Sequence, residues 1–456
     1  MHSEVNYSAE PSRGKIVKHL ILLCFILAVC AIEYLFDQKD FYSAFPLFAM
    51  GFGLMLLIYK SNYNLKMVIA AGIITRLAIL FVLPGFSDDV YRFFWDGRLI
   101  LEGINPYGII PKDALELRLP HLDTELFHLL NSPEYYTIYP PVNQFYFAIS
   151  ALTGDIKSYV VIMRLLIIAT ELAGIMYLLM LLKRRKLDTK SVILYYLNPL
   201  VILECIGNLH FEVVMLSFMI ISVYYLFDSK YVKGAFFLAC SIGVKLLPLM
   251  IIPFFLFRMP SKYRFRFLSL LSIFLMLIFI PLFFGFASVS FLSSVDLYFR
   301  KFEFNASIYY ILRYAGNLIS GYNLIQFIGP LLAIVTLMTN IYLANKYKKY
   351  SETNFWNYSL LVWTIYLLLS TTVHPWYIIS LVLFGILSDR TYPLVWSFLA
   401  FISYVNYSQL SYHENLWFVA IEYLLLWFVI IFEHKRSSLF STVRCQITRK
   451  LSPKAK

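Results

Sequence analysis

Two adjacent acids, Asp88 and Asp89, stand where a long apolar run gives way to the longest hydrophilic segment of the chain. Neighbouring residues on a helix point about 100° apart, so one carboxylate can act as a base while the other binds or orients. Apolar surroundings and a second negative charge raise the pKa of a carboxyl group, which suits the removal of a proton from a hydroxyl. The alternative is a solvated helix start, in which Ser87 caps the helix and the acids complement its dipole.

Cationic and imidazole side chains recur at apolar boundaries farther along the chain. Lys245 lies between two apolar runs, where an ionisable group indicates a functional site or, alternatively, a lysine that reaches the headgroup region. His210 and Glu212 stand at the end of one apolar run. His374 precedes a proline that breaks the next helix, so its ring and that of Trp376 can face a cavity.

The elements that position these residues are membrane helices. Of the 456 residues, 60% are hydrophobic and only 14% are charged, whereas soluble domains carry about 25% charged residues. Apolar stretches near twenty residues recur along the chain, and each can cross a hydrocarbon core about 30 Å thick. The run 267–285 does not alternate in polarity, which excludes the strands of an outer-membrane barrel.

The excess of basic residues fits membrane topology better than nucleic-acid binding. Lys and Arg outnumber Asp and Glu by 39 to 27, and they gather between apolar runs and in the tail 434–456. Retention of cationic loops on the cytoplasmic side predicts this distribution. The five cysteines show neither a disulfide framework nor zinc-type spacing, and the first apolar run lacks a signal-peptide cleavage site, so it is expected to remain as a span.

Charges at the ends of the apolar runs predict an all-α, polytopic membrane protein with about twelve crossings and short broken helices. The whole chain, 1–456, is expected to form one transmembrane domain. Both termini are predicted to be cytoplasmic, and the segment 85–140 is predicted to lie outside. A single crossing by 233–257 would violate the positive-inside rule, which favours a break around Lys245 and Pro248.

The hydrophilic segment is expected to begin with an amphipathic helix on the membrane surface. Its apolar residues recur at helical spacing opposite Arg92, Asp96 and Arg98. Asp96 is expected to pair with Arg92, four residues earlier, or with Arg98. In the preceding span, Arg76 either pairs with a buried acid such as Glu171 or binds a ligand.

Four sequence strings together carry a resemblance to a known superfamily. The string SDDVYRFFWDGRLILEGINPYG, followed by YPP at the start of the next apolar helix, resembles the first external loop of GT-C glycosyltransferases. The strings NPLVILECIGNLHFEVVML, GVKLLPLMIIPF and TTVHPWYIISL follow in the order expected of bacterial members that use polyprenyl-phosphate mannose. The resemblance covers about 85–390. It implies that a sugar leaves a lipid phosphate and joins an acceptor hydroxyl on the outer face, in a single displacement with inversion.

The resemblance also implies roles for individual residues. By position in the motif, Asp88 is the first choice for the base and Asp89 the second. Positive charge or hydrogen-bond donors must meet the leaving phosphate, and the side chains expected there are Arg92, Arg98, His210, Lys245 and His374. The side chains expected at the sugar or acceptor are Glu212, Tyr139 and Trp376, with Glu212 standing where the family more often has aspartate.

The expected partners are a polyprenyl-phosphate sugar, a lipid or glycan acceptor and membrane lipids, without nucleic acid. No cofactor and no metal ligands are assigned, because two adjacent acids supply few ligands. A divalent cation is left open, since some relatives in this superfamily use one. The expected location is the inner membrane of the bacterial cell envelope. The alternative function is a transporter or flippase of a lipid-linked saccharide, although no internal repeat is visible and the polar signal lies on one face.

Overall fold

The protein folds as a bundle of helices, as its composition predicts. The computed structural model describes residues 11–408 and 414–451, and within these ranges it holds no β-strand, only a β-bridge between Phe304 and Thr372. The last residues of the expected basic tail, 452–456, lie outside the described residues.

Five helices in the described ranges are long and apolar enough to cross a membrane, and one pair bent by 56° makes a sixth if it counts as a single span. The five are α1 (Pro11–Leu35), α2 (Phe41–Lys60), α8 (Ile156–Arg184), α17 (Ile325–Lys346) and α21 (Leu416–Leu451), the last by its stretch Leu416–Lys435. Helices of this kind are therefore fewer than the twelve crossings expected.

Several apolar runs form helices too short to cross a membrane on their own. The 16-residue helix α11 (Glu212–Phe227) is about 24 Å long, less than a hydrocarbon core of about 30 Å. Further helices outside the hydrophilic segment are α3 (Leu65–Ala78), α12 (Tyr231–Val244), α13 (Ile252–Arg258), α14 (Ser261–Ile278), α15 (Ala287–Lys301), α16 (Ile308–Ser320), α18 (Glu352–Leu369), α19 (Ile379–Ser388) and α20 (Tyr392–Leu399). Short 3-10 helices join several of them: η2 (Thr189–Val192), η5 (Ile280–Phe283), η6 (Pro375–Ile378) and η7 (Ala400–Tyr407).

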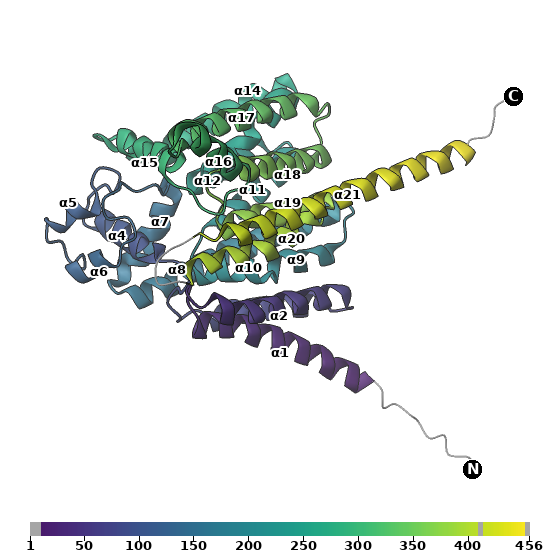
Figure 1. Ribbon diagram of the computed structural model, residues 1–456, viewed down its shortest axis with the longest axis horizontal. Coiled ribbons are helices and arrows are strands. Elements are labelled where there is room, and N and C mark those ends of the chain that lie inside the picture. Colours follow the sequence, from purple (N-terminus) through teal and green to yellow (C-terminus); the bar gives the residue numbers. More distant parts are fainter. Residues whose placement is uncertain (1–10, 409–413, 452–456) are drawn as a thin grey trace, which may run out of the picture.

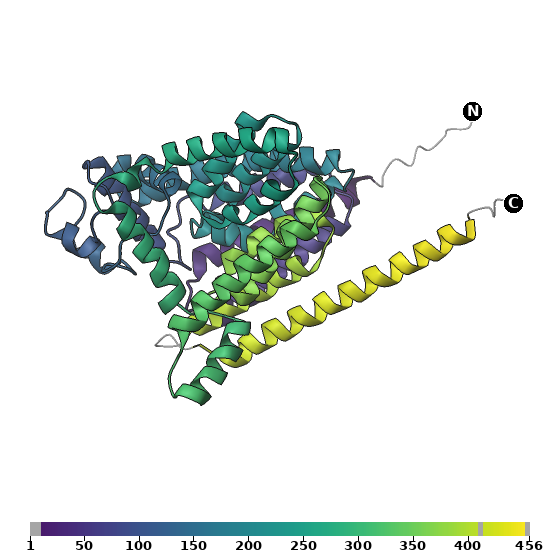
Figure 2. The same ribbon diagram turned by 90° about the horizontal axis from the view of Figure 1, so that it is seen from above.

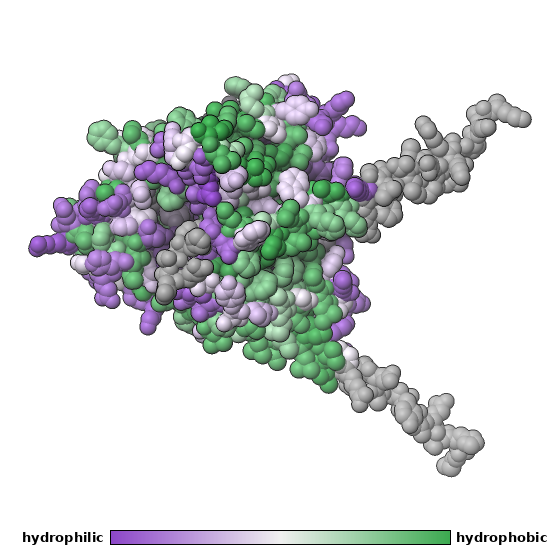
Figure 3. Space-filling model, in the orientation of Figure 1, coloured by the Kyte–Doolittle hydropathy of each residue, from purple (hydrophilic) through white to green (hydrophobic). Residues whose placement is uncertain are grey.

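The flank of the bundle exposes large apolar side chains. On α17, Phe327, Leu331 and Met338 are each more than half exposed. Figure 3 shows hydrophobic side chains over the flank and hydrophilic ones gathered at the left end. Because water disfavours apolar patches of this size and a lipid environment covers them, the chain is a membrane protein.

The expected break at Lys245 is confirmed. Helix α12 ends at Val244, Lys245 takes an extended backbone with φ −147° and ψ 145°, and the chain re-enters helix in η4 (Leu247–Ile251) and then α13. A second break was not predicted. It separates α9 (Ile193–Tyr196) from α10 (Pro199–Ile202), because the proline after Asn198 has no N–H to donate.

The hydrophilic segment folds as one compact end of the molecule. It contains α4 (Asp89–Leu101), α5 (Pro111–Leu115) and α6 (Thr124–His128), and α4 packs against the two elements that follow the segment, α7 (Pro141–Ser150) and η1 (Ala151–Thr153). In Figures 1 and 2 these elements lie at the left, while the start of α1 and the end of α21 lie at the right. The two ends of the bundle therefore carry different parts of the chain.

Helix α4 forms as predicted, but it does not lie on a surface. Its apolar side, including Val90 and Phe93, and its charged side, with Arg92, Asp96 and Arg98, are all buried. The expectation of a membrane-surface helix was wrong because the chain after α4 folds back over the charged side and supplies backbone carbonyl partners there. Asp96 pairs with Arg92 over 2.9 Å, as expected.

Gly97 allows α4 to cross α7 at very short range. A Cβ atom at this position would lie 2.4 Å from the backbone carbonyl oxygen of Phe147. Backbone atoms cannot move aside as a flexible side chain can, so only glycine fits at this crossing.

We expect Gly97→Ala to lower the free energy of unfolding by about 1–3 kcal/mol, the usual cost of overpacking. Thermal unfolding of the purified protein in detergent checks this. Gly53→Ala is the control, because a Cβ atom there meets no other atom within 4 Å. An equal melting temperature for both variants would contradict the close crossing.

Two buried arginines connect elements far apart in the sequence. Arg76 pairs with Glu171 at 2.6 Å, with both side chains fully buried, so the structural alternative for Arg76 is confirmed. Arg164 donates to the carbonyls of Ile206 at 2.7 Å and Leu80 at 3.0 Å. It thereby fixes the end of α3, which leads to Asp88, against the turn that leads to His210.

Candidate active site

A cavity of about 630 Å³ opens among the hydrophilic segment and later parts of the chain. Its walls come from the start of α4, the loop 131–140, the residues just before α11 and around the end of α12, helix α15, and the segments 302–304 and 372–377. Of the expected site residues, those that line it are Asp89, Arg92, Tyr139, His210, Lys245, His374 and Trp376. Most of the expected residues therefore meet at one place.

Asp89 presents its carboxylate to the cavity. Its Oδ1 accepts a hydrogen bond from Nδ2 of Asn131 over 2.7 Å, and its Oδ2 lies 3.8 Å from Nε2 of His210. Burial, the charge of Asp89 and a side-chain hydrogen bond to Asp89 together raise the pKa of Tyr139 well above its usual value. Asp89 is thus surrounded by polar groups that can hold a substrate hydroxyl beside it.

Asp88 faces another direction. Its side chain is exposed and does not line the cavity. Partial desolvation, followed by the charges of Asp89 and Asp37, raises its pKa, and Lys39 opposes this shift. Asp37 and Lys39 belong to the turn between α1 and α2, so the structure brings Asp88 close to that turn rather than to the other site residues.

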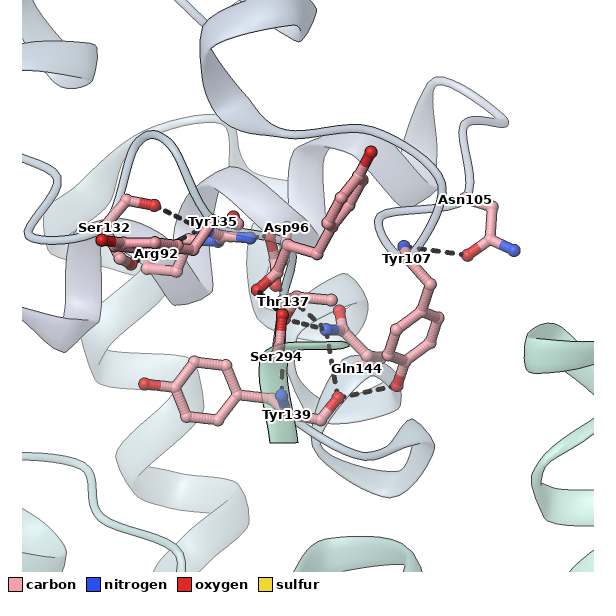
Figure 4. Close-up of polar contacts among 11 residues, drawn as sticks. Arg92, Asp96, Asn105, Tyr107, Ser132, Tyr135, Thr137, Tyr139, Gln144 and Ser294 are labelled. Carbon is pink, nitrogen blue, oxygen red and sulfur yellow. Dashed lines mark hydrogen bonds and ion pairs between the residues drawn. The ribbon is translucent and has the colours of Figure 1, made fainter. Parts of the chain in front are cut away.

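Arg92 brings a guanidinium group to the cavity wall. Nε pairs with Asp96, while Nη1 donates to the carbonyls of Ser132 at 2.9 Å and Tyr135 at 3.0 Å. Gln144 donates to the other oxygen of Asp96 over 3.0 Å, as Figure 4 shows. The buried Nη2 has no hydrogen-bond partner among the described residues, which leaves one donor for a ligand.

Arg98 does not reach the cavity. Its guanidinium donates to the carbonyl of Ala151 at 3.2 Å and to Glu102 at 3.1 Å, and it lies on the side of α4 that packs against η1. The structure therefore brings Arg92, but not Arg98, together with the other predicted side chains.

Lys245 reaches the cavity from the break between α12 and η4. Its ammonium pairs with Glu212, a fully buried acid that does not itself line the cavity, and it lies 5.3 Å from the ring centre of Tyr377. One oxygen of Glu212 has no partner among the described residues. The pair therefore places one cation at the cavity wall with its counter-charge behind it.

Four rings stack in sequence along one wall. Trp376 lies between His210, at 3.7 Å between ring centres, and His374, at 4.2 Å, and Phe304 stacks on the far side of His374 at 4.7 Å. Burial, followed by the charges of His210 and Lys245, lowers the pKa of His374 to about 3. His374 is therefore a neutral hydrogen-bonding group near pH 7 rather than a cation.

The segment that carries Phe304 is held by α21 and by Glu414, which lies just before it. The backbone N–H of Asn305 donates to Glu414 over 2.6 Å, and its side-chain amide donates to Glu422 over 3.1 Å. The hydroxyl of Tyr423 donates to the carbonyl of Asn305 over 2.7 Å. The wall of the cavity thus depends on contacts with α21.

Sequence reasoning missed Asn131, Phe304 and Glu204, which hold Asp89, His374 and His210 in place. Asn131 and Phe304 lie in loops with no motif of their own. Glu204 stands in an apolar run, where a buried acid indicates function by default. The position of Glu204 in the sequence therefore carried a signal for a site role. Within the described ranges, no three His, Cys, Asp or Glu side chains gather as metal ligands.

Comparison with known proteins shows which protein family this part of the chain resembles. Residues 44–261, just under half of the chain, match the MptA_B family, whose model describes the N-terminal domain of alpha-(1->6)-mannopyranosyltransferases. Over this stretch the chain is similar to that mannosyltransferase family. It is an enzyme, a hexosyltransferase, and the expected resemblance to GT-C mannosyltransferases is confirmed. No curated protein and no solved structure matches the chain.

The matched stretch covers only part of the mannosyltransferase's cavity. It includes Asp89, Arg92, His210 and Lys245, whereas Phe304 and the segment 372–377 lie beyond it. The acid and the two cations are therefore in the part that defines the family, and the aromatic wall is completed by later segments.

Proposed function

We propose that this mannosyltransferase transfers mannose from a polyprenyl-phosphate donor to a hydroxyl group of a lipid or glycan acceptor. The observation that carries the proposal is the meeting of the carboxylate of Asp89 with two cations, Arg92 and Lys245, at a single cavity. A carboxylate can take the proton of an attacking hydroxyl, and cations stabilise the charge that develops on a leaving phosphate. The membrane setting supports a lipid-linked donor.

Asp89 is the proposed base, with Asp88 outside the reacting groups. As the acceptor oxygen bonds to the anomeric carbon, the bond from that carbon to the phosphate oxygen breaks. The electron pair leaves with the phosphate, while the proton of the acceptor hydroxyl passes to Asp89. A single displacement of this kind inverts the configuration, so an α-linked product, which the family description supports, requires a β-linked donor.

Arg92, Lys245 and His374 are the proposed donor-phosphate groups. Arg92 contributes its unpaired Nη2. Lys245 contributes a charge that Glu212 holds in place, and His374 a neutral N–H. Trp376 and Tyr139 are proposed to contact the sugar, because a flat indole face suits the C–H groups of a pyranose and Tyr139 lies beside Asp89.

We propose that the cavity faces the extracytoplasmic side of a bacterial inner membrane and that both termini are cytoplasmic. Helices α4 and α15, which contribute residues to the cavity, lie at the end of the bundle opposite the start of α1 and the end of α21 (Figures 1 and 2). The basic residues that flank the apolar runs support this orientation.

The experiment incubates the purified protein in detergent with radiolabelled polyprenyl-phosphate mannose and a crude membrane-lipid extract, and follows the label by chromatography. We expect label to appear in a new lipid or glycan. A parallel reaction with a nucleotide-linked mannose tests the donor class, and EDTA tests for a divalent cation. Transfer only from the nucleotide-linked sugar would contradict the proposed donor.

A further inference from the structure

Glu204 lies directly behind His210 as seen from the cavity. It is fully buried in η3 (Leu203–Gly207), a single π-helical turn. Its Oε2 lies 3.1 Å from Nδ1 of His210, and its backbone carbonyl accepts from the backbone N–H of His210 over 3.0 Å. The hydroxyl of Tyr404 donates to Oε1 over 2.7 Å, and Asn208 donates to Oε2 over 3.3 Å. These contacts fix the acid and the imidazole relative to each other.

The surroundings of Glu204 define which nitrogen of His210 carries hydrogen. A carboxylate that accepts from Tyr404 and Asn208 also accepts from His210, so the hydrogen of the neutral ring lies on Nδ1. Nε2 then carries a lone pair. This atom is buried, has no hydrogen-bond partner among the described residues, and lies 3.8 Å from Oδ2 of Asp89.

We propose that Glu204 is a positioning residue that makes His210 the final acceptor of the proton removed by Asp89; this inference rests on the proposed function. A hydroxyl oxygen about 3 Å from both Asp89 Oδ2 and His210 Nε2 fits across the 3.8 Å that separates them. The proton passes from this hydroxyl to Asp89 and then to Nε2.

The product of this transfer is an imidazolium flanked by two carboxylates. Glu204 contacts its Nδ1–H, and Asp89 faces its Nε2–H, so both negative charges stabilise it. A lone pair at Nε2 would instead repel a phosphate oxygen. The proposal therefore replaces the expected phosphate contact of His210 with a role on the acceptor side.

The test compares kcat and KM of mannose transfer for Glu204→Gln, His210→Gln and the double variant. Gln at position 204 keeps the size of the side chain and removes its charge. We expect Glu204→Gln to lower kcat at least about tenfold, with the KM for the donor within about twofold. The double variant is expected to be no slower than His210→Gln, because Glu204 acts through His210.

Tyr404→Phe is the matched comparison. It removes a hydrogen bond to the Glu204 oxygen that does not contact His210 and leaves the charge of Glu204 in place, so we expect a lower melting temperature and a smaller loss of kcat than in Glu204→Gln. Independent, additive losses in the double variant would overturn the proposal. Equal losses of kcat in Tyr404→Phe and Glu204→Gln would overturn it as well, since they would indicate a structural role.

The failure of this inference is distinguishable from that of the proposed function. If the unaltered protein transfers no mannose, the proposed function fails. If the unaltered protein is active and Glu204→Gln keeps its kcat, only the role of Glu204 is overturned. If Glu204→Gln does not fold, Glu204→Asp replaces it in the same cycle, because the shorter acid keeps the charge but withdraws it from Nδ1.

Discussion

Asp89→Asn is expected to lower kcat for mannose transfer by about 10² to 10⁴-fold, the range that a positioned base contributes. The amide keeps the size of the side chain but cannot take a proton from the acceptor hydroxyl. The KM for the donor is expected to change little, because the proposed phosphate contacts come from Arg92 and Lys245. Steady-state kinetics with radiolabelled donor measure both values.

Asp88→Asn is the matched control for this result. The exposed carboxylate of Asp88 lies outside the cavity lining, so we expect kcat within about threefold of the unaltered protein. The reverse order, with Asp88→Asn inactive and Asp89→Asn active, would contradict the assignment of the base to Asp89 and favour the motif-based choice.

Lys245→Met is expected to lower both activity and stability. It leaves Glu212 as a buried acid without its counter-charge, and breaking a buried pair in this way costs about 3–5 kcal/mol. It also removes a cation from the leaving phosphate, for which we expect kcat to fall about 10²-fold. Thermal unfolding in detergent and transfer kinetics on the same preparation measure the two effects.

The double variant Lys245→Met/Glu212→Met separates the two effects. Replacing both charges with apolar side chains of similar size is expected to restore most of the lost stability. Activity is expected to stay low, because the cation is still missing. Recovery of transfer together with stability would show that Lys245 acts only as a structural partner of Glu212.

The sequence was sufficient to predict the helical membrane class and the break at Lys245, because apolar length, proline and charge placement act locally. The twelve crossings expected are not confirmed, since five helices of the described residues are long and apolar enough to span a membrane. A short apolar helix buried inside the bundle, such as α11, has the same composition as a lipid-facing span, and only the tertiary packing distinguishes them. The Asn-Pro pair at Asn198 carried a signal for the second break, since proline disfavours helix in the residue before it.

The candidate site was predictable as a set of residues but not as a geometry. Motif position cannot decide between Asp88 and Asp89, because the rotation of α4 decides which carboxylate faces the cavity. Asn208 contributes to that rotation by accepting a hydrogen bond from the backbone N–H of Phe86, 122 positions away, over 3.1 Å. The burial of Arg98 likewise depends on η1, which the spacing of residues in α4 does not reveal.

The attachment of the cavity wall to α21 has a consequence for biosynthesis. The segment that carries Phe304 is held through Asn305 by Glu414, Glu422 and Tyr423, which follow Asn305 by 109, 117 and 118 positions and leave the ribosome after it. The reacting groups Asp89, Arg92 and Lys245 are inserted into the membrane long before them. The nascent chain therefore carries its acid and cations in an open, incomplete cavity, and the site closes only when α21 has been synthesised.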